Sequence, residues 1–162
     1  MRGTGRLVTL LAVLIAIALP VAGDAQQNQA APAAYRPGLG DLMTTTVQPR
    51  HIKLGLAGQL GNWPYAAYEL HELQEAFDRA AAVWPTFRKF SIPDMMASVA
   101  KEPMAAVATA IEAGDANSFV VAYGQLTAAC NTCHQSTERG MIVIQRPEAS
   151  PFPDQDFRSP PK

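Results

Sequence analysis

The fold is decided by residues 115–140, DANSFVVAYGQLTAACNTCHQSTERG. Asp115 is a favourable N-cap, and Gly140 suits the position just beyond the end of a helix. Between them apolar side chains recur every three or four residues, which is the spacing of one face of an α-helix. That face carries Phe119, Tyr123, Leu126, Cys130 and Cys133. We therefore predict a helix over 115–139 whose buried face includes both cysteines.

Three further helical segments are expected upstream, because residues 39–114 are rich in Ala, Leu, Glu and Gln and never alternate with a period of two. The segments are 39–60, 63–84 and 92–114, the last of them in two pieces joined before Pro103. Asn62 and Ser91 are the expected caps. The predicted apolar face of the second segment is Ala66, Leu70, Leu73, Phe77, Ala81 and Trp84.

Four amphipathic helices joined by short turns pack most simply as an antiparallel bundle. We therefore expect an all-α fold, an antiparallel four-helix bundle over 39–140. Residues 141–162 carry several prolines, so no helix is expected there. Because this extended tail also carries Phe152 and Phe157, we expect it to strap the bundle.

The run Cys130-Asn131-Thr132-Cys133-His134 is the attachment pattern for c-type haem. Residues three and four apart lie on one face of a helix, so both thiols and the imidazole point the same way. The thiols are then placed to add to the haem vinyl groups, with His134 as the first axial ligand of the iron. The expected cofactor is one covalent haem c per chain.

Other uses of the two cysteines are less consistent with the sequence. A thioredoxin-like dithiol would lie at a helix start after a strand, whereas this pair lies late in a helix. A zinc site would need further ligands, such as His51 or His71, and there is no second metal-spaced pair. A disulfide suits a three-residue helical spacing poorly.

The N-terminus has the three parts of a secretory signal. Arg2 and Arg6 precede the apolar run Leu7–Leu19, and small residues follow at Gly23-Asp24-Ala25. We predict a cleaved signal peptide at 1–25, a flexible leader at 26–38, and export to the bacterial periplasm, where haem is attached covalently. Without residues 1–25 the net charge is near −2, which gives no basic surface for nucleic acid and no basic membrane patch.

The final helix, with Phe119, Tyr123 and the motif at 130–134, resembles that of the class II c-type cytochromes, cytochrome c′ and its low-spin relatives. The resemblance covers residues 39–139, including the helix order and a methionine early in the first helix. It implies a haem-binding four-helix bundle and, since such proteins are often dimers, a possible homodimer. Two departures are Pro49, within the first helix, and the 28 residues after His134. More narrowly, a group of small bacterial haem proteins has similar stretches at Arg50-His51-Ile52-Lys53-Leu54, Ala57-Gly58, Asn62-Trp63-Pro64, Ala67-Tyr68-Glu69-Leu70 and Gln145-Arg146-Pro147.

The second axial ligand is either Met43, His51 or absent. In an antiparallel bundle His134 is level with residues 45–46, closer to Met43 than to His51. The two candidates lie eight residues apart, about 12 Å along a helix and about 80° around it, so they cannot bind one iron together. Pro49 should kink or start the helix. Met43 is preferred, as in six-coordinate class II proteins, with His51 as the runner-up.

Three other charged or titratable residues have simpler interpretations. His71 is expected on the surface. Arg50 and Lys53 are expected to be solvated, although either could neutralise a haem propionate.

These features favour a non-enzymatic electron carrier in which the iron cycles between Fe(III) and Fe(II) and exchanges electrons with redox partner proteins. The alternative is a five-coordinate protein that binds NO or CO. A third reading is a helical bundle without haem that only holds partners together.

Overall fold

The structure is a computed structural model that describes residues 35–161. The predicted signal peptide (1–25) and residues 26–34 of the predicted leader lie outside this range. The described part is mostly helical and contains a small two-stranded sheet, so the prediction of a predominantly helical fold is confirmed. None of the helices within residues 35–161 has both the length and the apolar composition needed to cross a bilayer.

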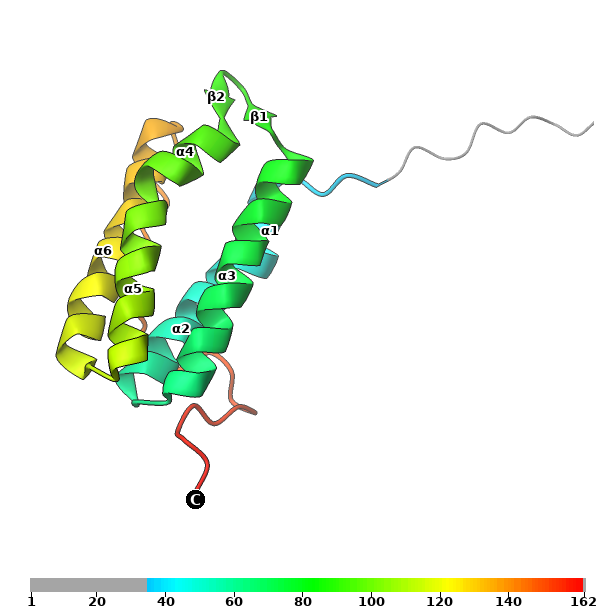
Figure 1. Cartoon of the computed structure of the whole chain (residues 1–162). Coiled ribbons are helices and arrows are strands. Elements are labelled where there is room, and N and C mark those ends of the chain that lie inside the picture. The colour runs from blue at the N-terminus through cyan, green and yellow to red at the C-terminus, as the bar shows by residue number, and fades with distance from the viewer. Residues whose placement is uncertain (1–34, 162) are drawn as a thin grey trace, which may run out of the picture. The chain divides into compact units, whose positions relative to one another are not determined.

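The first helical stretch is continuous but changes its winding. It consists of α1 (Leu39–Leu42), the π-helix η1 (Met43–Val47) and α2 (Gln48–Gln59). Pro49, which was expected to kink this stretch, lies in the first turn of α2. The disturbance takes the form of the π turn that ends two residues before it, at Val47. The later elements are α3 (Trp63–Val83), β1 (Thr86–Phe87), β2 (Phe90–Ser91), α4 (Ile92–Val99), α5 (Lys101–Ala113) and α6 (Ala116–Ser136) (Figure 1).

The predicted helix starts are confirmed by their capping bonds. The Asn62 side chain accepts a hydrogen bond from the Tyr65 N–H, and Ser91 accepts one from the Asp94 N–H. Asp115 accepts from the N–H groups of both Asn117 and Ser118. These bonds satisfy donors that have no partner inside the helix, so local sequence determines where α3, α4 and α6 begin.

The helices pack as two pairs, α2 with α3 and α5 with α6, and further contacts of α3 with α5 and of α2 with α6 join the pairs (Figure 1). Leu54, Leu73, Val107, Phe119 and Leu126 are almost completely buried between them. Burying a side chain of this size contributes about 1.5–3 kcal/mol. The apolar face predicted for the final helix is therefore the one that packs in the core.

The buried face of α3 is rotated from the predicted one. Leu70 and Ala81 were expected inside but are only half-buried, whereas Ala76 and Ala80 are buried. Glu69, with 1% of its surface exposed, shares this face. Its carboxylate lies 3.2 Å from a guanidinium nitrogen of Arg50 on α2. A buried carboxylate needs such a partner, so an ion pair between helices fixes the orientation of α3.

The end of α6 also differs from the prediction. The helix stops at Ser136, short of the expected boundary at Gly140. The Thr137 hydroxyl donates to the Cys133 carbonyl at 2.8 Å, and Glu138 adopts a left-handed conformation with φ of 62°. The Glu138 carboxylate pairs with Arg88 and Lys89. Both lie in the turn of the β1–β2 hairpin, an element not expected from the sequence. α6 therefore ends two residues before the residue that contacts this hairpin.

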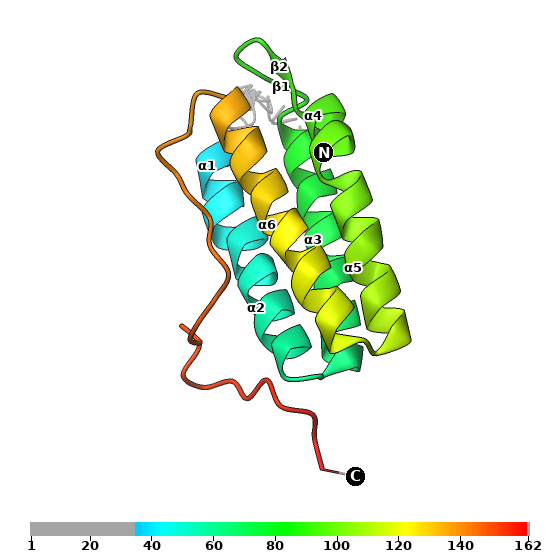
Figure 2. The ribbon, with the colours of Figure 1, turned by 90° about the vertical axis from the view of Figure 1, so that its left-hand side faces the viewer.

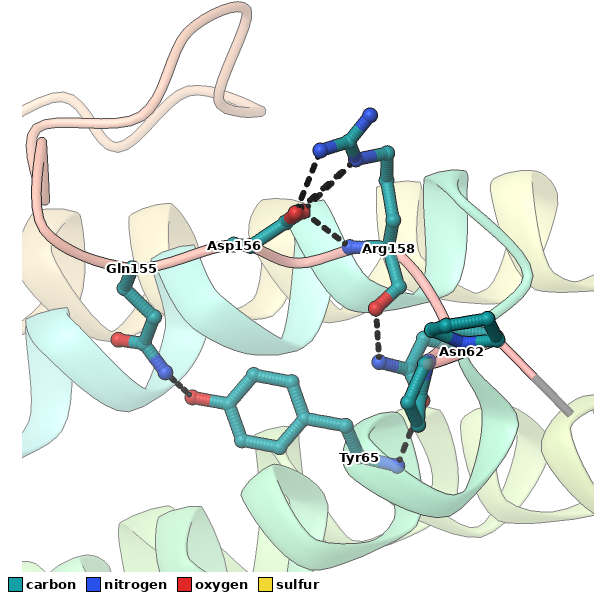
Figure 3. Close-up of a pocket in the computed structure, with 8 residues that line it drawn as sticks. Asn62, Tyr65, Gln155, Asp156 and Arg158 are labelled. Atoms are coloured by element: carbon teal, nitrogen blue, oxygen red, sulfur yellow. Dashed lines mark hydrogen bonds and ion pairs between the residues drawn. The ribbon is translucent and has the colours of Figure 1, made fainter.

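The C-terminal segment, residues 141–161, follows α6 and then α2 towards the α2–α3 turn (Figure 2). Phe157 is buried and its ring lies 5.8 Å from that of Tyr65. The Asn62 amide donates to the carbonyls of Phe157 and Arg158, both at 3.2 Å. Figure 3 shows the bond to Arg158 together with the bond from the Gln155 amide to the Tyr65 oxygen. The segment is thus joined to the helices by side chains far from it in sequence.

Two of the four described residues of the predicted leader, Arg36 and Pro37, contact the C-terminal end of α3. The Arg36 guanidinium donates to the Val83 carbonyl and lies 3.6 Å from the centre of the Trp84 ring. The Trp84 indole N–H donates to the Pro37 carbonyl at 2.9 Å. These contacts hold the chain beside α3 just before α1 begins.

Candidate functional site

A largely apolar cavity of about 270 Å³ lies where the first helical stretch, α4 and the C-terminal end of α6 meet. We call it the motif pocket, because Cys130, Cys133 and His134 all line it. Its apolar wall comes from side chains far apart in sequence, namely Leu39, Val47, Phe77, Phe87, Ile92 and Val99. The structure therefore brings the three predicted attachment residues to one apolar pocket.

The two cysteines are free thiols. Burial and the neighbouring Cys133 raise the pKa of Cys130 to about 11, and burial also raises the pKa of Cys133. Reactive dithiols lie in surroundings that lower the thiol pKa, so these are protonated thiols at neutral pH. The Cys133 sulfur lies 3.3 Å from the Met95 sulfur, on α4.

His134 is oriented by the chain that follows α6. Its Nδ1 lies 2.8 Å from the Ile142 carbonyl oxygen. Because a carbonyl only accepts hydrogen bonds, Nδ1 carries the hydrogen. In the neutral ring Nε2 then has a free lone pair, which is the arrangement usual for a metal-binding histidine.

Met43 and His51 both line the motif pocket, although they were expected on different sides of the helix. In an α-helix eight residues turn the chain by about 800°, which leaves the two side chains about 80° apart. The π turn at Met43–Val47 holds one residue more than an α turn, so the rotation falls to about 700°, which is 20° short of two full turns. The π turn therefore brings both candidates to the pocket.

His51 is held by a hydrogen-bond network, with only 2% of its surface exposed. Its Nδ1 lies 3.1 Å from the Tyr123 hydroxyl, and its Nε2 lies 3.0 Å from the Thr127 hydroxyl. The Tyr123 hydroxyl donates its single hydrogen to the His51 carbonyl at 2.8 Å, so its oxygen accepts from Nδ1. Burial lowers the pKa of His51 to about 4, so the ring is neutral. Both ring nitrogens of His51 therefore already have hydrogen-bonding partners in the protein. The Met43 side chain is half-buried and lines the pocket.

Three charged or titratable residues considered from sequence lie elsewhere. Arg50 pairs with the carboxylates of Glu69 and Glu72, and Lys53 lies over the Phe152 ring at 4.7 Å. His71 is exposed beside Glu75, as predicted. None of these residues lines the motif pocket.

Met95, Met96 and Arg139 also line the motif pocket, and none of the three was predicted from the sequence. The available signal was the pair of adjacent methionines in a short helix after the Ser91 cap. Arg139 follows α6 and supplies the pocket with a cationic side chain.

No family model, curated protein or solved structure matches this chain. Within residues 35–161, no three or more His, Cys, Asp and Glu side chains are grouped so that they could hold a metal ion. Haem iron needs one or two protein ligands, because the macrocycle supplies the others.

Proposed function

We propose that this chain is a c-type cytochrome that carries electrons. Cys130 and Cys133 would hold one haem through thioether bonds, and His134 would be the first axial ligand. One observation carries the proposal: the three motif side chains share an apolar pocket, and the Ile142 carbonyl leaves Nε2 of His134 free. The free thiols with raised pKa also favour this use of the cysteines over a redox dithiol.

We further propose that the helices form an antiparallel four-helix bundle of the class II cytochrome type, with residues 141–161 as a strap. The first bundle helix would comprise α1, η1 and α2, the second α3, the third α4 and α5, and the fourth α6. The contacts between α2 and α3, between α5 and α6, and across the two pairs support this arrangement.

The residues around the pocket suit a haem. Bound haem supplies reversible one-electron Fe(III)/Fe(II) cycling. The apolar wall excludes water, which strengthens electrostatic effects at the centre, and Arg139 offers a cationic partner for a propionate. The Met43 thioether is the proposed second axial ligand, because both ring nitrogens of His51 are already engaged. A His/Met pair gives a higher reduction potential than a His/His pair.

Export to the periplasm is part of the proposal and rests on residues 1–25. Covalent haem attachment takes place outside the cytoplasm, so the signal and the motif agree. The proposed partners are redox proteins, and a homodimer remains a proposal drawn from the class II resemblance.

The deciding experiment is an absorption spectrum of the ferric and ferrous protein produced in a cytochrome-maturing host. We expect haem that stays attached after denaturation and a low-spin spectrum in both states. A high-spin protein that binds carbon monoxide at once would favour the gas-binding alternative. A colourless protein would contradict the cytochrome proposal itself.

A further inference from the structure

We propose that Asn131, inside the attachment motif, is a positioning residue for His134 and acts through the backbone of residues 142–144. The inference rests on the proposed function, since it assigns His134 an iron to bind. Asn131 and Thr132 are the two residues between the cysteines of the motif. The inference gives the first of them a defined role and makes the C-terminal segment part of the site.

The chain reverses direction directly after α6. The Arg139 N–H donates to the His134 carbonyl at 2.7 Å, and the Ile142 N–H donates to the Arg139 carbonyl at 2.8 Å. Residues 142–144 therefore run back beside the last turns of α6. This reversal places the Ile142 carbonyl at Nδ1 of His134, although the two residues are eight positions apart.

Asn131 fixes the returning chain through two hydrogen bonds. Its Oδ1 accepts from the Ile144 N–H at 2.7 Å, and its Nδ2 donates to the Ile144 carbonyl at 2.9 Å. The side-chain amide thus pairs with one residue's backbone as a neighbouring strand would. Because Ile144 is two residues from Ile142, this pairing restrains the carbonyl that contacts His134.

Thr132, the other residue between the two cysteines, makes no such contact. The Thr132 side chain is exposed, and its hydroxyl donates to the Ala128 carbonyl within α6. The two neighbouring residues therefore differ in one respect that matters here: only Asn131 is bonded to the returning chain.

The C-terminal segment is also held beyond this point. The Gln59 amide donates to the Pro147 carbonyl at 3.3 Å. The Asn62 amide donates to the carbonyls of Phe157 and Arg158, and Figure 3 shows the bond to Arg158. A backbone fixed on both sides of Ile144 has little freedom to move away from His134. The ring orientation is consequently maintained by bonds to α6 and α2.

The hydrogen bond to Nδ1 has a chemical consequence. A carbonyl acceptor increases the electron donation of the ring through Nε2 and fixes its tautomer. Stronger donation stabilises Fe(III) relative to Fe(II). Weakening the Asn131 pairing should therefore raise the midpoint potential and expose the Nδ1 hydrogen to solvent.

The test compares Asn131→Leu, which keeps the size of the side chain but no hydrogen bonds, with the matched control Thr132→Val. Ile144→Pro is a second variant that removes the N–H donor without changing α6. In the full-length mature protein we would measure the midpoint potential and the solvent exchange of the His134 Nδ1 hydrogen by NMR. The exchange is read in the ferrous state, with carbon monoxide added if the iron is high spin.

We expect Asn131→Leu and Ile144→Pro to raise the midpoint potential and to accelerate exchange by about tenfold, the equivalent of one lost hydrogen bond. Thr132→Val should match the wild type in both. Wild-type values in both test variants, or an equal shift in the control, would overturn the inference. The absorption spectrum of each sample reports haem attachment separately. If haem is absent, the exchange of the Nδ1 hydrogen still tests the positioning role.

Discussion

Gly58 of α2 lies so close to the Phe119 ring of α6 that a Cβ at this position would overlap the ring carbons. Gly55, nearly one turn earlier, has the same relation to the Tyr123 ring. The two rings stack on each other with their centres 5.6 Å apart. Helices α2 and α6 therefore pack with aromatic rings of one against the bare backbone of the other.

Gly58→Ala should lower the free energy of unfolding by about 1–3 kcal/mol, because the added methyl must displace the Phe119 ring from a packed core. Gly124 of α6 is the control, since an added Cβ there meets no atom within 4 Å. Gly124→Ala should raise stability by about 0.5–1 kcal/mol through helix propensity. Urea unfolding measures both, and equal effects at the two sites would contradict the packing argument.

The double variant Cys130→Ala, Cys133→Ala should lose covalent haem. Two thioether bonds are proposed, so haem-linked peroxidase staining should survive a denaturing gel in the wild type and vanish in the variant. Each single variant should keep staining of reduced intensity, because one thioether remains. A wild-type protein that releases its haem on denaturation would show that the thiols are not bonded to it.

Met43→Ala should convert the iron to high spin, lower the midpoint potential and allow carbon monoxide to bind the ferrous protein, because the proposed thioether ligand is lost. Met96→Ala is the matched control, as it removes another methionine from the same pocket. His51→Ala should leave the spin state unchanged. If only the Met96 or only the His51 variant loses the low-spin spectrum, that residue is the ligand instead.

Stability should decrease as the pH falls from about 6.5 to about 4. Burial lowers the pKa of His51 from 6.5 to about 4 in the folded protein. Between these values the unfolded chain binds a proton that the folded chain does not, so the free energy of unfolding falls by about 3 kcal/mol in total. The full contribution is present above pH 6.5. His51→Gln should flatten this part of the profile, whereas His71→Gln, at an exposed site, should retain it.

Phe157→Ala should lower the free energy of unfolding by about 1.5–3 kcal/mol, the contribution of one buried phenylalanine. Phe152→Ala should cost less, because that ring is only half-buried. Ending the chain after Gly140 should lower the melting temperature further, since it also removes the bonds to Asn62 and Asn131. A truncated protein as stable as the full chain would show that the C-terminal segment contributes nothing to the fold.

The parts of the fold that sequence predicts well are those determined within a few residues. The caps at Asn62, Ser91 and Asp115 are local hydrogen bonds, and the face of α6 follows from helical spacing alone. The convergence of Cys130, Cys133 and His134 on one pocket is predictable for the same reason. Each of these features requires knowledge of one helix only.

Features that depend on distant partners were missed. Glu69 looks like a solvated residue until Arg50 is placed beside it on α2. The Ile142 carbonyl has no sequence signature at all, because any residue supplies a carbonyl and only the chain reversal after α6 brings this one to His134. Pro49 indicated a disturbed helix but not its form, and the π turn determines which side chains reach the pocket.

The π turn also fixes where this chain could change in length. Because η1 holds one residue more than an α-helical turn, deleting one residue between Met43 and Val47 would restore regular winding and leave α1 and α2 facing as they do now. A homologue with one residue fewer between Met43 and Val47 would therefore keep the packing of α1 and α2 and differ only in the part of the pocket wall that η1 forms. Within α2 or α6 the same deletion would rotate the rest of the helix by about 100° and carry core side chains out to solvent.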